Sequence, residues 1–454
     1  MARIVIIGAG LTGLSAAYHL EQKGFFDYVL FEQHHTPGGL CGSVVQDGFT
    51  FDFTGHLLHI NDHYCRQFID TVIGFDFFNT IQRKSYIYSH DCYTAYPYQV
   101  NLYGLPHEVI IECITGFAER AQHKKNKSFK DWVLSQFGAG FAKHFFIPYQ
   151  EKIFSYPIDR ITASWTSRFV PPTTLHTILQ GTLQEPIHTI GYNSHFYYPK
   201  NGGILSWVLK IADTLKNPIL CNHSVTAIDT NTKTIHIANG HTESYDLLIN
   251  TMPLDTLLTK LIERPRIDCK KAAKKLLCNR VFNFNLGINR PNISDNHWIY
   301  YPERIYPFYR IGFPHNLSTL MTPPGCSSLS GEIAYLNNQS HSTDTYQQAR
   351  THIKQLFDVH ESEIITEKII TINHAYVIFD FWREKNLPQL LNQLSQEHIY
   401  SIGRYGAWKY ASMQEAILDG KQIADQITII PARNIHQIPP VITPPTKEIE
   451  CLEK

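Results

Sequence analysis

Three glycines near the start of the chain, and an acid that follows them, are spaced to bind the diphosphate and ribose of a dinucleotide. Gly8 permits a tight turn, Gly10 lets the backbone approach a pyrophosphate, and Gly13 lets the next helix pack on a strand. The helix N-terminus adds free N–H groups and a partial positive charge. Glu32 follows about 20 residues later, where its carboxylate can accept hydrogen bonds from ribose hydroxyls. The predicted site comprises Gly8, Gly10, Leu11, Thr12, Gly13, Glu32 and Gln33.

A second glycine pair indicates that this dinucleotide is FAD rather than NAD. Gly38 and Gly39 come just after the strand that carries the acid, and Leu40 follows them. Glycine backbone can pass close to the pyrophosphate from the other side. Gly55 and His56 follow the next hairpin, where a mobile loop could touch the flavin ring. The alternative for His56 is a hairpin end with a chance histidine.

The composition limits the class of protein. The chain has 454 residues, of which 43% are hydrophobic, and 40 basic side chains balance 40 acidic ones. This length accommodates two or three domains, and the balanced charge gives no indication of a nucleic-acid partner. The basic run at 123–127 is typical of a solvated loop. No run approaches the roughly 18 apolar residues that span a bilayer, so we expect a cytoplasmic protein without a membrane partner.

The cysteines and histidines do not indicate a metal site. Nine cysteines are scattered without a CxxC motif, which is typical of free thiols in a reducing compartment. His59 and His63 have HxxxH spacing, but no glutamate accompanies them. We therefore predict no metal.

The elements that must position these residues begin with a strand, a helix and a second strand. Alternation around an Asp-Gly turn predicts a hairpin over 43–52, and alternation again predicts a strand over 86–93. Apolar residues at helical spacing predict helices within 108–141. A buried apolar run at 245–251 indicates that the chain returns to the dinucleotide fold, and 279–371 is rich in strand patterns.

We therefore expect an α/β protein: a Rossmann-type FAD-binding domain with a helical insertion and an antiparallel-sheet substrate domain. The expected boundaries are 1–100, 190–262 and 395–430 for the discontinuous FAD-binding domain, 101–189 for the insertion, 263–394 for the substrate domain and 431–454 for a proline-rich tail.

Five blocks of the sequence together resemble the UDP-galactopyranose mutases, within the amine-oxidase-like flavoproteins. The blocks are Gly38–His56, Tyr96–Asn101, Trp298–Arg310, Phe381–Lys385 and Gly403–Tyr410. The last is the most specific, because ordinary amine oxidases usually have Gly-Asp or Gly-Glu where this chain has Gly403-Arg404.

The resemblance implies a flavin-dependent pyranose/furanose mutase that acts on a nucleotide-diphosphate sugar. In that family reduced FAD is the active form, and its N5 is a nucleophile toward the anomeric carbon, with no net redox change. A reductant such as NAD(P)H and an oligomeric state are further implied partners. A different base or sugar from UDP-galactose stays open.

The resemblance also implies roles for particular residues. Arg310 can grip phosphate oxygens in a bidentate way, and it is a catalytic candidate together with His56 and Tyr410. Candidates for substrate binding are Tyr98, Gln99, Phe154, Arg168, Arg280, Trp298 and Tyr300. Further cofactor-binding candidates are Gly38, Gly39, Leu40, Gly55, His56, Val225, Gly403, Arg404, Ser412 and Met413. For the aromatic residues, plain core packing is the alternative.

The chain departs from the family pattern at three places. Phe169 aligns with a family arginine, and Leu387 aligns with a family tyrosine. The acid or asparagine expected after Tyr410 is replaced by small or neutral residues, Ala411, Ser412 and Gln414. These departures weaken the assignment of UDP-galactose itself more than that of the chemistry. Two other functions remain open: an FAD oxidoreductase of the amine oxidase or protoporphyrinogen oxidase type, and a binding protein that keeps FAD without turnover.

Overall fold

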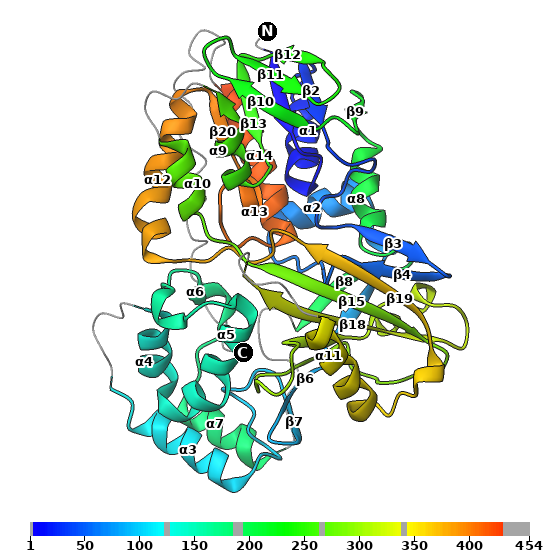
Figure 1. Ribbon diagram of the computed structural model, residues 1–454, viewed down its shortest axis with the longest axis vertical. Coiled ribbons are helices and arrows are strands. Elements are labelled where there is room, and N and C mark those ends of the chain that lie inside the picture. The colour runs from blue at the N-terminus through cyan, green and yellow to red at the C-terminus, as the bar shows by residue number, and fades with distance from the viewer. Residues whose placement is uncertain (1–2, 122–127, 185–193, 263–267, 337–342, 430–454) are drawn as a thin grey trace.

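The computed structural model of the chain describes residues 3–121, 128–184, 194–262, 268–336 and 343–429 (Figure 1). Three parts meet near the middle of the molecule: a parallel sheet with its helices at the top, a helical region at the lower left and a large sheet at the lower right. The basic run at 123–127 and the tail at 431–454 lie outside the described residues.

The parallel sheet has five short strands, all of them parallel to their neighbours. They lie in the order β20 (Ile399–Ser401), β13 (Leu247–Asn250), β1 (Ile4–Ile7), β2 (Tyr28–Phe31) and β9 (Ile219–Leu220). Almost every residue of these strands is apolar and buried, which is typical of a parallel sheet covered on both faces. The apolar run at 245–251 thus supplies a central strand, as predicted.

Helices cover one face of the parallel sheet, and a smaller sheet covers the other. Ile4 and Ile6 pack on the helical face while Val5 and Ile7 pack on the opposite face, because side chains alternate along a strand. The helices are α1 (Leu11–Gln22), α2 (His63–Val72), α8 (Leu205–Ala212) and α14 (Met413–Ile429). The smaller sheet has the order β12 (Thr242–Ser244), β11 (Thr234–Ile237), β10 (Val225–Asp229) and β14 (Leu261–Ile262).

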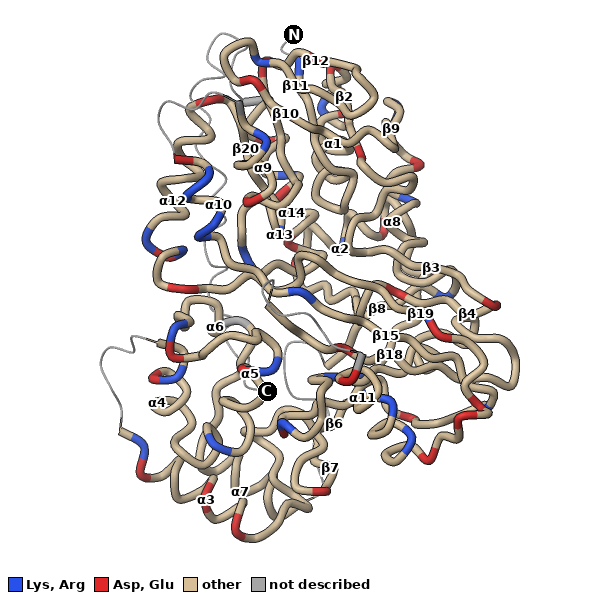
Figure 2. Tube along the Cα trace, in the orientation of Figure 1, with Lys and Arg blue, Asp and Glu red and all other residues tan. Residues whose placement is uncertain are grey.

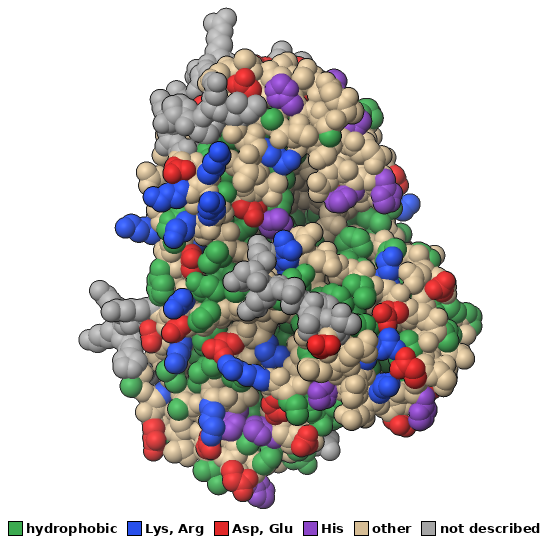
Figure 3. All heavy atoms as spheres, viewed as in Figure 1, with side chains coloured by type: hydrophobic (Ala, Val, Ile, Leu, Met, Phe, Trp, Pro, Cys, Tyr) green, Lys and Arg blue, Asp and Glu red, His purple; other side chains and the backbone are tan. Residues whose placement is uncertain are grey.

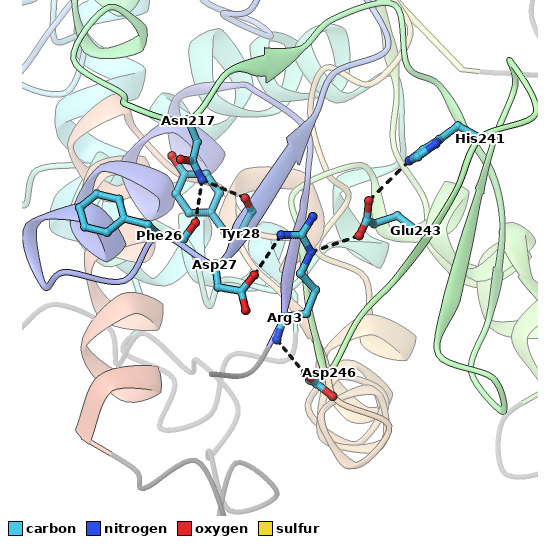
Figure 4. A network of polar contacts seen from close by, with 8 residues as sticks. All are labelled: Arg3, Phe26, Asp27, Tyr28, Asn217, His241, Glu243 and Asp246. Carbon is cyan, nitrogen blue, oxygen red and sulfur yellow. Dashed lines mark hydrogen bonds and ion pairs between the residues drawn. The ribbon is translucent and has the colours of Figure 1, made fainter.

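A polar network stabilises the edge of the parallel sheet at which β1 and β2 begin (Figure 4). Arg3 Nη1 lies 3.0 Å from Asp27 Oδ1, and Arg3 Nε lies 3.1 Å from Glu243 Oε1. The backbone N–H of Arg3 donates to Asp246 Oδ2 at 2.7 Å. Ligands of parallel α/β sheets bind beyond the carboxyl ends of the strands. This network lies at the amino-terminal ends of β1 and β2, on the opposite side of the sheet from the glycine turn.

The large sheet joins segments that are far apart in the sequence. Its seven strands lie in the order β19 (Ile364–Ile372), β15 (Arg280–Ile288), β18 (Ser327–Tyr335), β17 (Arg310–Gly312), β16 (Trp298–Tyr300), β6 (Ser85–Ser89) and β7 (Cys92–Ala95). All neighbours are antiparallel except β16 and β6. Helix α11 (Thr343–Leu356) packs against the face that carries Phe282 and Phe284.

Two expectations about domain membership are wrong. The single strand predicted over 86–93 is the hairpin β6–β7, and it pairs with β16 of the large sheet instead of belonging to the FAD-binding part. Helix α12 (Phe381–Gln396), which falls in the predicted substrate domain, packs beside β20 of the parallel sheet. Local patterns specify strand or helix, but they do not specify the neighbouring element.

The helical region falls within 101–189, the range expected for an insertion. Its elements are α3 (His107–Ala118), α4 (Phe129–Phe141), a π-helical turn (Ala142–Phe146), α5 (Ile147–Phe154), α6 (Thr166–Phe169) and α7 (Leu175–Leu183). Helices α3 and α4 can approach closely because Gly140 has no side chain; a Cβ at this position would lie 2.2 Å from the carbonyl oxygen of Glu112. The expected helical stretch at 108–141 is thus two helices in the described residues.

Shorter elements connect the three parts. They are β3 (Ser43–Gln46), β4 (Phe49–Asp52), β5 (Phe78–Gln82), β8 (His195–Pro199), α9 (Leu254–Lys260), α10 (Cys269–Lys275), α13 (Gly403–Gly406) and 3-10 turns at Phe75–Phe77, Ile158–Arg160, Pro314–Asn316, Thr319–Met321 and Glu361–Glu363. The predicted hairpin is β3–β4, with Asp47 at φ 52° and Gly48 at φ 80°, as a type I′ turn requires.

The surface carries mixed charge. Figure 2 shows basic and acidic residues interspersed along the chain, and Figure 3 shows the visible face hollowed near its centre, where the three parts meet. No described helix is both long and apolar enough to cross a membrane. Among the described residues no group of His, Cys, Asp and Glu is arranged to hold a metal ion, and the eight described cysteines are free thiols.

Candidate active site

The glycine turn after β1 has the geometry that a pyrophosphate requires. Gly8 has a φ of +99°, and a Cβ on Gly13 would lie 1.9 Å from Gly8 O, so both positions require glycine. Gly10 precedes α1 without a side-chain cap, which leaves helical N–H groups free for a ligand. A Cβ on Gly10 would meet only Gly39 Cα, at 3.8 Å, so the space beside Gly10 is open.

The second glycine pair lies directly against the first. The N–H of Gly38 donates to Ala9 O at 2.9 Å, and Gly10 and Gly38 form an isolated parallel bridge. Gly39 has a φ of +58°, and its Cβ would lie 3.1 Å from Gly10 Cα. The two turns thus form one narrow cradle that side chains would fill, which fits the pyrophosphate of a dinucleotide.

Glu32 lies at the end of β2, with its carboxylate held in place. Its Oε2 accepts from the N–H of Ala9 at 2.8 Å, and its Oε1 accepts from the N–H of His34 at 2.9 Å. A carboxylate offers roughly four acceptor positions, so two remain for ribose hydroxyls. Gln33 is exposed beside it, whereas Val225 is buried in β10 and its carbonyl already accepts from Lys260 Nζ.

The turn that precedes α14 closes the other end of this cradle. Gly403 has a φ of +80°, and its Cβ would lie 2.7 Å from Thr12 Oγ1, so the turn sits on the start of α1. Ser412 lies just before α14, and its N–H donates to Glu415 Oε2 at 2.7 Å. Met413 begins the helix and is buried. The helix N-terminus favours negative charge, such as that of a reduced flavin.

One row across the large sheet gathers the candidate substrate residues. The strand register pairs Tyr300 with Arg310, Arg310 with Glu332, and Glu332 with Asn283. Directly opposed residues on neighbouring strands share a face of the sheet. The four side chains therefore lie on the face opposite to helix α11, which packs on Phe282.

A buried ion pair fixes the guanidinium of Arg310. Its Nη2 and Nε donate to Glu332 Oε1 at 2.6 and 3.0 Å, and the carboxylate is only 3% exposed. The Tyr309 hydroxyl donates to the other carboxylate oxygen. Burial, the largest single effect, lowers the pKa of the Arg310 guanidinium, but the Glu332 carboxylate and the neighbouring tyrosines together outweigh it, so the pKa is raised overall. A Cβ on Gly55 would lie 3.2 Å from Arg310 Nη2, so the flavin-side loop passes directly over this cation.

Aromatic rings line one side of this row. The ring of Tyr300 lies 5.3 Å from that of Tyr96 and 5.4 Å from that of Tyr149, which projects from α5. Trp298, two residues earlier on β16, packs at 6.4 Å against Tyr300 and at 5.8 Å against Phe196. Trp298 is 6% exposed, so it supports Tyr300 from the core.

A second group of rings comes from the segment between β19 and α12, from the turn before α14 and from the helical region. Tyr376 and Tyr410 are nearly parallel at 6.1 Å, and Phe154 meets Tyr376 edge-on at 6.2 Å. Phe169 meets the Tyr410 ring edge-on at 4.5 Å. We call the combined set the aromatic chamber: Tyr96, Tyr149, Phe154, Tyr300, Tyr376 and Tyr410.

Arg404 places a second cation at the aromatic chamber. Its guanidinium lies 4.6 Å from the Tyr410 ring centroid and 5.8 Å from that of Tyr376. Nη1 donates to Ala411 O at 2.8 Å, and Nη2 donates to Ala375 O at 3.1 Å. Within the described ranges no carboxylate pairs with Arg404, and its buried Nε has no hydrogen-bond partner there. Its positive charge is therefore available to an anionic ligand.

His56 lies within range of both cations. Burial, together with the guanidinium groups of Arg404 and Arg310, lowers the pKa of His56 to about 4. The imidazole is therefore neutral at physiological pH, and one ring nitrogen can accept a proton. The structure thus brings His56, Arg310, Arg404, Tyr300 and Tyr410 together, and their roles toward substrate and cofactor stay predictions.

Two of the predicted substrate residues pack in the core instead. Tyr98 is fully buried, and its ring stacks on Phe145 at 5.0 Å inside the helical region. Gln99 is 2% exposed and donates from Nε2 to Pro171 O at 3.0 Å. In this geometry neither side chain is exposed to a ligand. Tyr98 therefore fits the alternative given for the aromatic candidates, which is packing in the core.

The two additional arginines lie apart from the row that carries Arg310. Arg280 begins β15, three residues before Asn283, so alternation along the strand places it on the other face of the large sheet. Its role in substrate binding, which the resemblance implies, stays a prediction. Arg168 belongs to α6, but its side chain lies outside the described residues.

Three residues that contribute to the site were not predicted. Glu332 is a lone acid inside the buried strand β18, and such an acid signals a paired cation. Tyr376 gives no sequence signal, because tyrosine is abundant in this chain. Arg383 begins α12 and donates from Nε to Trp408 O at 2.9 Å, which holds the turn that carries Tyr410.

Comparison with known proteins agrees with this geometry. The structure is similar to the crystal structure of reduced UDP-galactopyranose mutase, with a TM-score of 0.88 and 27% identity over 97% of this chain and 98% of that one. It is also similar to a putative protoporphyrinogen oxidase from Exiguobacterium sp. 255-15 (TM-score 0.74, 15% identity, 94% and 99% covered). Putrescine oxidase bound to putrescine gives a TM-score of 0.65 at 13% identity, with 94% and 99% covered. The last two likenesses show the fold alone.

Sequence similarity points to the same family. The chain is 33% identical to 4,4'-diapophytoene desaturase of Staphylococcus aureus strain COL over 91 residues, which span 20% of this chain and only 18% of that protein. The model of the family described as flavin containing amine oxidoreductase matches residues 11–428. The expected α/β fold with a Rossmann-type dinucleotide domain is confirmed. The chain therefore belongs to the flavin containing amine oxidoreductase family, and FAD is its cofactor.

Proposed function

We propose that this protein is an isomerase that interconverts the pyranose and furanose forms of a nucleotide-diphosphate sugar with reduced FAD and no net redox change. The observation that carries the proposal is the pair of cations, Arg310 and Arg404, at an aromatic chamber beside the flavin-side loop. The similarity to UDP-galactopyranose mutase over nearly the whole length supports it.

The two arginines suit a diphosphate that leaves and returns. Breaking the bond between the anomeric carbon and its oxygen places negative charge on the diphosphate, and guanidinium groups stabilise such charge through charge-assisted hydrogen bonds. Glu332 orients Arg310 through two hydrogen bonds, so this cation needs little rearrangement when the charge develops. Arg404 donates to the carbonyl oxygens of Ala411 and Ala375, and among the described residues no carboxylate forms an ion pair with it.

The aromatic chamber suits the nucleotide and the sugar. Aromatic faces stack on a base and exclude water from the anomeric carbon. Tyr96, Tyr149 and Tyr410 each bring a phenolic hydroxyl to this chamber. Each can therefore donate to a phosphate oxygen or accept from a sugar hydroxyl.

The flavin supplies, when bound and reduced, a nucleophilic nitrogen without a net transfer of electrons. The residues Gly8–Gly13, Glu32, Gly38–Gly39 and Gly403 would hold it, and neutral His56 can accept and return a proton as the sugar ring opens and closes. The alternative of an FAD oxidoreductase is supported by the fold alone.

The test is an anaerobic incubation of dithionite-reduced holoprotein with UDP-galactopyranose and a panel of other nucleotide sugars, with product analysis by chromatography. The proposal predicts a furanose product from at least one of them, and it predicts no product with oxidised enzyme. Activity confined to the oxidised enzyme, with electrons passed to oxygen, would show that the protein is an oxidoreductase.

A further inference from the structure

Lys152 of helix α5 extends into the loop that joins strands β16 and β17. Its Nζ donates to the carbonyl oxygens of Tyr301 at 2.5 Å, Glu303 at 2.9 Å and Phe308 at 2.7 Å. An ammonium group has three N–H donors, so this loop uses all of them. The three acceptors all belong to the loop 301–308.

This loop has the candidate substrate residues at its two ends. Tyr300 is the last residue of β16 and Arg310 the first of β17, and the two are directly paired. The N–H of Tyr301 donates to Tyr309 O at 3.0 Å, which continues the pairing into the loop. A displacement of the loop would therefore move both side chains.

Helix α5 belongs to the helical region and carries two residues of the aromatic chamber. Tyr149 lies one turn before Lys152, so both project from the same side of the helix. The Tyr149 ring contacts Tyr300 at 5.4 Å, and Phe154 contacts Tyr376 at 6.2 Å. The helical wall of the chamber and the sheet wall thus meet at this helix.

We propose that Lys152 is a positioning residue that sets the width of the substrate site by tying helix α5 to the β16–β17 loop. The nature of the ligand in this inference rests on the proposed function. The contact between Lys152 and the loop does not depend on it. The tie consists of three hydrogen bonds, one from each N–H of the ammonium group to a carbonyl oxygen. Burial lowers the pKa of Lys152 well below its usual value, and the Glu303 carboxylate offsets this only in part.

The chain provides a matched control between the same two elements. Arg304 Nη2 of this loop lies 2.6 Å from Glu151 Oε2 of α5, but the Arg304 side chain is 77% exposed. Exposed pairs contribute little to stability. Arg304→Gln therefore removes a contact between the same helix and loop without removing the buried tie.

The experiment compares Lys152→Met with Arg304→Gln in the FAD-loaded protein. In Lys152→Met we expect amides of residues 301–309 to exchange hydrogen at least ~10-fold faster, and the dissociation constant for UDP to rise at least ~10-fold, because three buried acceptors lose a charged donor. FAD content and exchange in the β1–α1 unit stay as in the wild type. Arg304→Gln behaves like the wild type in all these measurements.

Two results would overturn the proposal: unchanged exchange in 301–309, or unchanged UDP affinity in a variant whose loop has loosened. If Lys152→Met does not fold, Lys152→Arg decides, because its planar fork keeps the charge but cannot match three carbonyls of this arrangement. Normal FAD content with weaker UDP binding then supports the tie, and unchanged binding refutes it. A wild type that binds neither UDP nor any other nucleoside diphosphate contradicts the proposed function, while hydrogen exchange still tests Lys152.

Discussion

Replacement of Arg310 by Met should lower both the stability of the fold and the affinity for the nucleotide. A second substitution at Glu332 should restore the stability but not the affinity. The guanidinium of Arg310 contacts Glu332 at 2.6 and 3.0 Å, and the carboxylate is almost completely buried. Without Arg310, the donors to the Glu332 carboxylate among the described residues are the Tyr309 hydroxyl and the N–H of Gly55, the latter at 3.4 Å. The variant therefore contains a buried carboxylate without a counter-ion.

The size of the effect follows from the balance between attraction and desolvation. Two unit charges 3.0 Å apart attract by about 5–6 kcal/mol at an effective dielectric constant of about 20. Desolvation of both ions offsets most of this attraction, so the pair as a whole contributes little. Removal of one partner typically costs about 3–5 kcal/mol, and the two remaining donors place Arg310→Met near about 3 kcal/mol.

The assay combines unfolding of the holoprotein with UDP binding. Arg310→Met should lower the free energy of unfolding, and the double variant Arg310→Met/Glu332→Gln should recover more than half of the loss. UDP affinity should fall in both variants by roughly 1.5–3 kcal/mol, the typical contribution of a charge-assisted hydrogen bond. Arg304→Gln, which removes an exposed pair of the same 2.6 Å separation, should change stability by less than about 1 kcal/mol. The reasoning fails if the double variant is as unstable as the single one, or if the single variant is as stable as the wild type.

Three further predictions concern the cofactor cradle and its surroundings. Gly10→Ala should fold normally, since its Cβ would meet only Gly39 Cα at 3.8 Å, but it should lose FAD affinity because the methyl group fills the space for the pyrophosphate. Gly13→Ala should fail to fold, because its Cβ would lie 1.9 Å from Gly8 O. Circular dichroism measures folding, and the absorbance of bound flavin measures FAD binding. Glu32→Leu should lower FAD affinity at least ~100-fold, because the carboxylate that the N–H groups of Ala9 and His34 hold in place can no longer accept hydrogen bonds from the ribose hydroxyls. An unchanged flavin-to-protein ratio after dilution would argue against this. Burial raises the pKa of Asp52 from 3.8 to about 6, so between these pH values the folded state binds more protons than the unfolded state. The free energy of unfolding should therefore fall by about 3 kcal/mol as the pH rises through this range. Urea titrations from pH 4 to 7 should show this fall in the wild type but not in Asp52→Asn.

Several features could be predicted from the sequence because nearby residues determine them. The glycine turn, the acid after β2 and the Asp47-Gly48 hairpin each depend on the φ preferences of residues only a few positions apart. The Arg404 turn was recognisable because it is a continuous block whose resemblance to a family does not depend on register. In each case the sequence contains the geometry within one short segment.

Features that depend on strand register could not be predicted. Arg280 and Arg310 are both arginines in apolar strands, and only the pairing of Arg310 with Glu332 and of Glu332 with Asn283 shows that they lie on opposite faces. A shift of one residue would exchange the two faces. The sheet to which the hairpin β6–β7 belongs could not be predicted for the same reason. Its alternation predicts strands, but its partner β16 lies more than 200 residues later.

The buried pair of Tyr98 and Phe145 illustrates a third limit. A tyrosine beside Gln99 looks the same in sequence whether it lines a ligand site or a core. The π-helical turn Ala142–Phe146 brings Phe145 onto the Tyr98 ring, and no periodicity in the sequence indicates such a turn. Packing between distant segments therefore decides which aromatic residues remain available to a ligand.

The central claim is that the bond between the sugar and its diphosphate breaks and re-forms without net oxidation. Positional isotope exchange tests it directly: UDP-galactopyranose, or the nucleotide sugar that the panel identifies, carries ¹⁸O in the oxygen that bridges the anomeric carbon and the phosphorus. With reduced holoprotein under anaerobic conditions, the label should move into non-bridging phosphate positions, and the flavin should stay reduced. A label that stays in the bridge, while the same protein binds the nucleotide sugar and retains reduced FAD, would contradict the account.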